Sequence, residues 1–182
     1  MKLMFASDLH GSASACQKML AAYRAEKAER LVLLGDLLYH GPRNDLPDGY
    51  APKEVIRQLN AAKNELFCVR GNCDTEVDQM VLDFPILAES ALILTDGITL
   101  YLSHGHHIDP ASPPPLKDGD VLVGGHTHLF GADRIGGNHR LNDGSVALPK
   151  GGNPPTYLVY EERVFLWKTL EGEEVSRLRL DE

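Results

Sequence analysis

Five short polar signatures, each directly after an apolar run, constrain the fold of this chain most strongly. They are Asp8-Leu9-His10, Gly35-Asp36, Gly71-Asn72-Cys73-Asp74, His104-Gly105-His106 and Gly124-Gly125-His126-Thr127-His128. The apolar runs before them, such as 31–34 and 121–123, have the length and composition of buried strands. Because ligands gather at the carboxyl ends of strands in α/β sheets, this repeated context predicts one site built from loops far apart in the sequence.

The first 70 residues alternate between strand patterns and helix patterns. Strands are expected at Leu3–Ala6, Leu31–Leu34 and Leu66–Val69. Ser12 is expected to cap a first helix, and Pro52 suits the first turn of a second. The apolar stripes of these helices are Cys16, Met19, Leu20 and Tyr23, and Val55, Ile56 and Leu59. This strand–helix order predicts parallel strands joined by helical crossovers.

The remaining sequence is rich in strand patterns. Asp96-Gly97, between the runs 91–95 and 98–103, is a strong hairpin signal. Further short runs are Val121–Val123, Ala132–Ile135, His139–Leu141, Ser145–Leu148, Tyr157–Tyr160, Val164–Leu170 and Val175–Leu180. Glycine-containing turns separate them, which favours mostly antiparallel pairing. We therefore expect an α/β protein with two sheets packed face to face and helices outside, folded as a single domain over residues 1–182.

Composition limits the classes of function. The formal net charge is -8, without the clustered lysines and arginines of stable nucleic-acid binding, and this disfavours a nuclease. A small anionic substrate stays possible because bound cations would reverse the local field. The three cysteines form no CxxC pair, no signal peptide is evident, and no apolar run approaches the roughly 18 residues of a membrane span. A cytoplasmic protein that does not bind membranes is expected.

The residue types in the signatures are metal ligands. The seven candidates are Asp8, His10, Asp36, Asn72, His104, His126 and His128. Seven ligands exceed the needs of one cation and suit two, with one carboxylate bridging them. The pairs Asp8–His10 and His126–His128 have a period of two, which on a strand places both side chains on one face. Oxygen and imidazole donors without thiolate favour Mn, Fe, Zn, Co or Ni over Ca or Mg.

A two-metal site predicts hydrolysis of a phosphate ester. Two cations roughly 3.5–4 Å apart activate a hydroxide, neutralise a phosphoryl oxygen and orient in-line attack. Metal-bound water has a pKa near 7, against about 15.7 in bulk water. The expected reaction is therefore attack of a metal-bound hydroxide on a small phosphodiester, without a covalent intermediate.

In their order, these signatures resemble those of the calcineurin-like metallophosphoesterases, from Asp8 to His128. The loop 40–44 and the segment 142–154 are most similar to the small bacterial phosphodiesterases of the YfcE type. The resemblance implies a four-layer α-β-β-α sandwich of two mixed β-sheets flanked by helices. It also implies two divalent ions, with Mn²⁺ as the first expectation, and a homodimer or homotetramer.

The resemblance further implies how the ligands divide. Asp8, His10 and His128 would hold one ion, and Asn72, His104 and His126 the other. Asp36 would bridge the two ions and so take part in catalysis.

One residue departs from the commonest family pattern. Cys73 stands where most of the superfamily has a histidine that protonates the leaving group or contacts the phosphate. An unperturbed thiol, with a pKa near 8.5, is a poorer general acid at neutral pH than an imidazole near 6.5. We therefore assign Cys73 a catalytic or phosphate-binding position and expect a preference for good leaving groups, such as those of aryl phosphodiesters.

Other readings stay open for individual residues. Arg43 in the long loop 41–52 and His106 are candidate substrate contacts, although an ordinary solvated role is equally compatible with either. Asp74 either holds a metal-ligating histidine in place or begins the next helix. For the whole chain, a phosphomonoesterase with the same site is the first alternative. A scaffold that has lost catalysis, as in the similar retromer subunit of eukaryotes, is the second, but it predicts eroded ligands, and all seven positions keep competent types.

Overall fold

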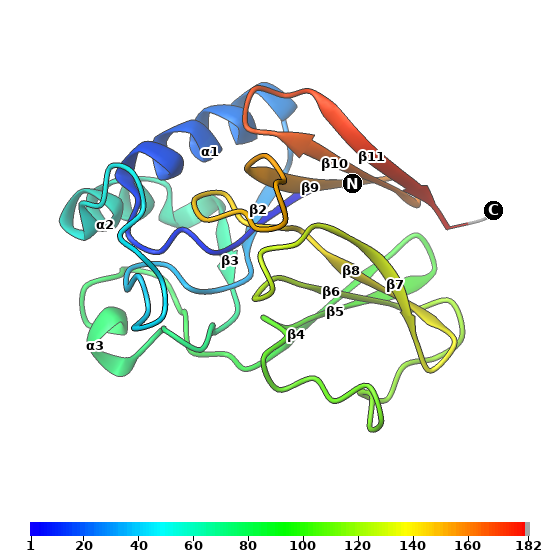
Figure 1. The fold of residues 1–182 in the computed structure, drawn as a ribbon. Coiled ribbons are helices and arrows are strands. Elements are labelled where there is room, and N and C mark those ends of the chain that lie inside the picture. Colours follow the sequence, from blue (N-terminus) through cyan, green and yellow to red (C-terminus); the bar gives the residue numbers. More distant parts are fainter. Residues whose placement is uncertain (181–182) are drawn as a thin grey trace.

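Two mixed β-sheets packed face to face form the centre of the fold, as Figure 1 shows for the computed structural model, which describes residues 1–180. The first sheet has the strand order β11-β10-β9-β1-β2-β3 and the second has β4-β5-β6-β8-β7. The strands of the first sheet are β1 (Lys2–Ala6), β2 (Arg30–Leu33), β3 (Leu66–Cys68), β9 (Thr156–Glu161), β10 (Val164–Thr169) and β11 (Glu174–Arg179). Those of the second are β4 (Ala91–Thr95), β5 (Ile98–Leu102), β6 (Val121–Gly124), β7 (Gly131–Ile135) and β8 (Asn138–Asn142). The predicted α/β class with two mixed sheets is confirmed.

Helices α1 (Ala13–Glu26) and α2 (Pro52–Ala61) pack on the outer face of the first sheet. The Ser12 hydroxyl caps α1 by accepting a hydrogen bond from the Ala15 amide at 3.2 Å, and Pro52 opens α2, as the sequence predicts. A short 3₁₀ helix, η1 (Lys63–Glu65), precedes β3, and α3 (Glu76–Gln79) is a single turn. No described helix is long and apolar enough to cross a membrane.

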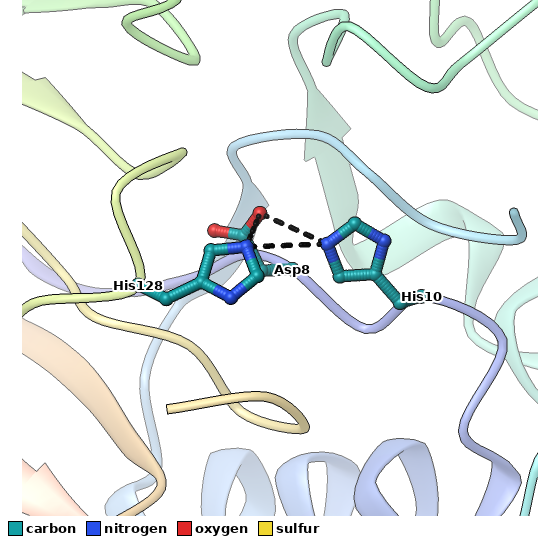
Figure 2. A group of neighbouring side chains, drawn as sticks. All are labelled: Asp8, His10 and His128. Atoms are coloured by element: carbon teal, nitrogen blue, oxygen red, sulfur yellow. Dashed lines mark hydrogen bonds and ion pairs between the residues drawn. The ribbon is translucent and has the colours of Figure 1, made fainter. Parts of the chain in front are cut away.

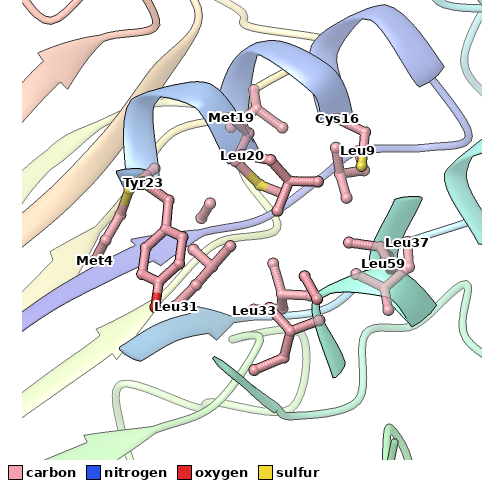
Figure 3. Close-up of a cluster of buried hydrophobic side chains, with 14 of the residues drawn as sticks. Met4, Leu9, Cys16, Met19, Leu20, Tyr23, Leu31, Leu33, Leu37 and Leu59 are labelled. Carbon is pink, nitrogen blue, oxygen red and sulfur yellow. The ribbon is translucent and has the colours of Figure 1, made fainter. Parts of the chain in front are cut away.

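Alternate residues of the central strands enter two separate cores. Met4 and Ala6 of β1 face the helices, where they join the cluster of Figure 3 with Met19 and Leu33. Leu3 and its alternate neighbours face the second sheet and form a core between the two sheets. Strands buried on both faces carry apolar residues continuously, which explains why these runs lack alternation in the sequence.

The parallel strands place the five signatures on one side of the molecule. Strands β1, β2 and β3 are parallel to one another, and β6 is parallel to both β5 and β8. The chain leaves β1, β2, β3, β5 and β6 directly into the signatures. The segment 103–120, between β5 and β6, lies outside the second sheet as turns and extended chain, where Ile108 and Leu122 line one small cavity.

The prediction of a strand at 145–148 is wrong. These residues form a loop because the Ser145 hydroxyl bonds one local and one distant backbone group: it accepts from the Leu148 amide at 2.9 Å and donates to the Asp8 carbonyl at 3.0 Å. The chain then continues into β9, which pairs antiparallel with β1 and so brings the C-terminal strands back to the first sheet.

Candidate metal centre

The seven candidate ligands lie in the loops beyond the strands, and most of them have an unusual backbone. Five have positive φ angles: Asp8 (58°), His10 (45°), Asp36 (57°), His126 (72°) and His128 (61°). A non-glycine residue in this region costs of order 1 kcal/mol or more, and such residues cluster at functional sites. The expectation that strand periodicity orients the two pairs is wrong, because β1 ends at residue 6 and β6 at residue 124. Tight turns orient these side chains instead.

Asp8, His10 and His128, here called the Asp8 group, converge on one point (Figure 2). The Oδ1 atom of Asp8 lies 3.4 Å from Nε2 of His10 and 3.2 Å from Nε2 of His128. The two Nε2 atoms are 3.3 Å apart. All three residues are buried, with exposed fractions of 0%, 1% and 3%.

The hydrogen bonds around the Asp8 group fit a cation. Nδ1 of His10 contacts the Tyr39 carbonyl at 2.8 Å, and Nδ1 of His128 contacts the Leu148 carbonyl at 2.6 Å. A carbonyl only accepts, so each Nδ1 carries the ring proton and, in the neutral ring, Nε2 presents a lone pair. The buried Oδ1 of Asp8 has no hydrogen-bond partner among the described residues. Two lone pairs and an unpaired carboxylate oxygen therefore face one another, and a divalent cation satisfies all three.

Asn72, His104 and His126, here called the His104 group, form a second cradle. Nδ1 of His104 donates to the Leu34 carbonyl at 2.7 Å, which leaves Nε2 to face Oδ1 of Asn72 at 3.0 Å. The His126 ring lies 5.0 Å from that of His104 between centroids. This group is more open, because Asn72 is exposed and His126 only half-buried.

Asp36 lies between the two groups. Its Oδ2 atom is 3.7 Å from Nε2 of His10 and 3.5 Å from Nε2 of His104. Its Oδ1 atom accepts a hydrogen bond from the Cys73 amide at 2.8 Å, which fixes the carboxylate. One oxygen thus faces both cradles, the position that a bridging ligand requires.

Two glycines make this close packing possible. A Cβ atom at Gly71 would overlap Asp36, and one at Gly125 would overlap Ser7. The glycines of the signatures therefore serve close approach between loops.

Three carboxylate and hydroxyl side chains support the ligand loops: Asp74, which the sequence left with two readings, and Ser7 and Asp143, which it did not point to. Asp74 accepts hydrogen bonds from the amides of Asp36 (2.8 Å), Leu37 (2.9 Å) and Gly71 (2.7 Å), so it joins two of the ligand loops. Asp74 thus positions backbone amides of the ligand loops rather than a histidine, and Thr75, not Asp74, caps α3.

Behind Asp8, the Ser7 hydroxyl lies 2.6 Å from Oδ2 of Asp8 and 2.8 Å from Oδ1 of Asp143, and all three residues are fully buried. A hydroxyl has one proton, so it donates to only one of the two carboxylates at a time. Burial and the negative charge of Asp8 raise the pKa of Asp143 well above its usual value, which favours a neutral Asp143 that donates to Ser7. In the sequence, Ser7 is linked to the site only by its position directly before Asp8. Asp143 lies 135 positions after Asp8, and no sequence pattern links it to the site.

An open cleft of about 400 Å³ adjoins both groups. Arg43, Cys73 and Lys150 line it together with ligand residues. Two of the residues predicted as substrate contacts, Arg43 and Cys73, thus line the cleft, and so does Lys150, which the sequence did not point to. The third, His106, does not line this cleft; the centroid of its ring lies 5.4 Å from that of His104 and 6.0 Å from that of His126.

The charges of the site shift several pKa values in the metal-free protein. Burial lowers the pKa of His104, but the hydrogen bond to Asp36 and the charges of Asp8 and Asp36 outweigh it and raise that pKa to about 9. Burial lowers the pKa of His126, and the neighbouring His104 lowers it further. Burial and the charge of Asp36 raise the pKa of the Cys73 thiol to about 12, so at neutral pH this thiol is protonated.

The chain is similar to several known proteins. Phosphodiesterase YfcE of Escherichia coli strain K12 is 52% identical over 157 residues, which cover 86% of this chain and 85% of YfcE. The solved structure of the E. coli phosphoesterase YfcE matches with a TM-score of 0.94 at 46% identity, over 99% of this chain and 100% of that one. Zinc-bound Vps29 from Entamoeba histolytica shares the fold alone, with a TM-score of 0.59 at 20% identity over 99% of each chain.

The sequence profile of the calcineurin-like phosphoesterase superfamily domain matches residues 1–163, a span that contains all seven candidate ligands. The two mixed sheets and the cluster of side chains that could hold metal ions beyond the strand ends agree with this match. The chain therefore belongs to the calcineurin-like phosphoesterase superfamily.

Proposed function

We propose that this protein is a phosphodiesterase that works with two divalent cations, one in the Asp8 group and one in the His104 group, bridged by Asp36. The observation that carries the proposal is the position of Asp36, whose Oδ2 faces His10 at 3.7 Å and His104 at 3.5 Å. When bound, such a pair of cations supplies an activated water and neutralises the phosphoryl oxygens. The naming of the E. coli relative as a phosphodiesterase supports the same reaction class.

The protein side chains have separate tasks in this proposal. Asp8 and Asp36 provide the negative charge that holds the cations, and the neutral amide of Asn72 keeps that charge low enough for an anionic substrate to enter. Arg43 and Lys150 line the cleft and bind the substrate phosphate or a group attached to it. The nitrogen and oxygen donors suit Mn²⁺ and, as alternatives, Fe, Zn, Co or Ni.

Cys73 limits the substrates that the site hydrolyses well. Its thiol lies at the cleft with a pKa raised to about 12 by burial and by Asp36, so it is a weak proton donor at neutral pH. We infer that the leaving group departs without strong general-acid help, and that aryl diesters react faster than alkyl diesters.

One observation favours a phosphomonoesterase as the second candidate. Arg43 and Lys150 add two positive charges to the cleft, and a monoester dianion would use this excess charge better than a diester monoanion. The net charge of -8 and the size of the cleft favour a small substrate over a nucleic acid in either case.

A substrate panel on metal-analysed protein tests the proposal. The purified protein is loaded with Mn²⁺, its metal content is measured, and kcat/KM is determined for an aryl diester, the aryl monoester with the same leaving group, and an alkyl diester. We expect two metals per chain and the highest kcat/KM for the aryl diester. A higher value for the monoester would establish the second candidate, and equal rates for alkyl and aryl diesters would contradict the inference about Cys73.

The variant Cys73→Ala separates the possible roles of this thiol. If the thiol contacts the substrate, turnover changes and metal content stays at two. If metal content falls, Cys73 is a ligand, a possibility that its place within 4.8 Å of donor atoms of His10 and Asp36 raises.

A further inference from the structure

A second group of metal-ligand side chains lies outside the cleft, at the turn that follows β5. The turn is closed by a hydrogen bond from the Ile108 amide to the Gly105 carbonyl at 3.2 Å, and Gly105 has a φ of 109°. This turn presents His106 and His107 side by side, with ring centroids 3.9 Å apart. Two adjacent imidazoles are therefore held together by the backbone.

The hairpin register brings a carboxylate to the same place. Ala91 of β4 pairs with Leu102 of β5, so the residues just before β4 lie beside those just after β5. Glu89 is thereby placed next to the two histidines. One donor atom each of Glu89, His106 and His107 lie within 4.8 Å of one another. In the described residues, the other groups of this kind all belong to the central cleft.

We infer that Glu89, His106 and His107 form an auxiliary site for a transition-metal ion of the Zn²⁺ type. Two imidazoles and one carboxylate are a donor set that Zn²⁺ accepts, and Zn²⁺ has no electronic preference for one geometry, so small rearrangements of exposed side chains suffice to complete the site. His106 also has a buried Nδ1 atom without a hydrogen-bond partner among the described residues, and binding through either ring nitrogen would give that ring a defined orientation.

The auxiliary site is separate from the two cradles of the cleft. His106 packs against the rings of His104 and His126 at 5.4 and 6.0 Å, so an ion at its far side would lie next to the His104 group without sharing a ligand with it. Neither Glu89 nor His107 lines the cleft. The inference therefore does not rest on the proposed phosphodiesterase activity.

Arg70 competes with the ion for Glu89. Its Nη1 atom lies 3.1 Å from Oε1 of Glu89, and its Nε atom donates to the Asp74 carbonyl at 3.2 Å. The pair is partly exposed, with 34% of the arginine side chain and 56% of the glutamate side chain accessible. Exposed ion pairs of this kind are weak, so a divalent cation can displace the guanidinium. Removal of Arg70 should then strengthen metal binding, a result opposite to that of removing a ligand.

The test is equilibrium dialysis of the full chain against Zn²⁺, followed by metal analysis. We expect three ions per chain for the unmodified protein and two for His107→Ala. Glu89→Gln should weaken the third ion by at least about tenfold, since even loss of an outer partner of a metal ligand costs about that much. Arg70→Gln should strengthen it. His139→Ala, which changes a histidine of β8 outside this group, is the matched control and should keep three.

One result would overturn the inference: a number of bound ions that is the same in His107→Ala as in the unmodified protein, whatever number the cleft holds. Asp36→Asn distinguishes this failure from that of the proposed function, because it should remove ions from the cleft and leave the auxiliary ion bound. Absorption spectra of the Co²⁺-substituted proteins give a second readout, because the bands of the auxiliary ion should be missing from His107→Ala alone.

Discussion

The two cradles of the candidate metal centre differ in how completely the protein arranges their side chains in the absence of a cation. In the Asp8 group all three side chains are buried, and their donor atoms lie 3.2–3.4 Å from one another. In the His104 group only His104 is fully buried, while Asn72 is exposed and His126 half-buried. Each group has three candidate ligands, two of them histidines, from loops beyond strand ends. Besides the charge of Asp8 against the neutral amide of Asn72, burial and support therefore distinguish the two groups.

Backbone strain is distributed in the same uneven way. All three residues of the Asp8 group have positive φ angles, whereas in the His104 group only His126 does. Strained residues persist where the surrounding structure determines them fully. The Ser7–Asp143 pair behind Asp8 and the carbonyls that orient both of its histidines provide that support.

From this difference we expect two bound ions to be held with unequal affinity. A rigid, buried cradle loses little freedom when it binds, so the Asp8 group should hold its ion more tightly. The open His104 group, next to the cleft, should exchange its ion more readily.

Asp36→Asn should have the largest effect, because it removes a charge that both cradles share. Metal content should fall below two ions per chain, and turnover should fall by at least about 100-fold. Even the loss of a residue that only contacts a metal ligand lowers metal affinity or activity by about 10- to 100-fold. Metal analysis and steady-state kinetics measure both quantities, with the exposed Asp118→Asn as the control. Two metals and full turnover would show that Asp36 does not bridge.

His10→Ala and His126→Ala compare the cradles directly. Each should weaken its own ion by about 10- to 100-fold or more, but His10→Ala should abolish the tight step of a metal titration and His126→Ala only the weak step. Stepwise calorimetric titration of metal-free protein resolves the two. If His126→Ala removed the tight step instead, the order of the cradles would be reversed.

The sequence predicts the parts of this structure that local signals specify. The Ser12 cap, the Pro52 helix start and the Asp96-Gly97 hairpin each depend on a few neighbouring residues, and the structure confirms all three. The loop at 145–148 was missed because its geometry depends on a hydrogen bond from Ser145 to Asp8, 137 residues away. No local pattern carries such a contact.

The same distinction holds in the site. The seven candidate ligands were chosen from motifs, and the structure brings them to one place. Of the residues that support them, Asp74 keeps two readings in the sequence, and Ser7 and Asp143 have no signal, because an aspartate or serine in a turn looks the same whether it caps a loop or supports a ligand. Lys150 was missed because it lies in the cleft only through the return of the chain after β8.

Proton binding should separate the two histidines of the His104 group in the metal-free protein. The pKa of His104 is raised to about 9, and that of His126 is lowered below its usual value of 6.5. Below pH 9 a cation must displace the His104 proton. As the pH increases toward 9, metal affinity of the His104 group should therefore increase by up to about tenfold per pH unit. NMR titration of the imidazole resonances measures both midpoints, and two midpoints near 6.5 would contradict the assigned charges.

The pH dependence of the stability of the metal-free protein tests independently whether folding raises the pKa of His104. A histidine whose pKa is raised by folding adds stability that is fully present below about pH 6.5 and is lost as the pH rises through 9. Urea unfolding should show a loss of up to about 3 kcal/mol over that range, because each unit of pKa shift is worth about 1.4 kcal/mol. His104→Gln should lack this contribution.

Ser7→Ala should have the smallest effect and should reveal whether support from behind matters. The variant keeps every ligand but removes the hydroxyl that joins Asp8 to Asp143 at 2.6 and 2.8 Å. Affinity for the tight ion should fall by roughly tenfold, the low end for loss of an outer partner, while the weak ion is unaffected. The exposed Ser112→Ala is the control, and both steps are read from one titration. Equal weakening of the two ions would mean that the buried pair stabilises the fold in general, and the greater rigidity of the Asp8 group would then need another origin than Ser7.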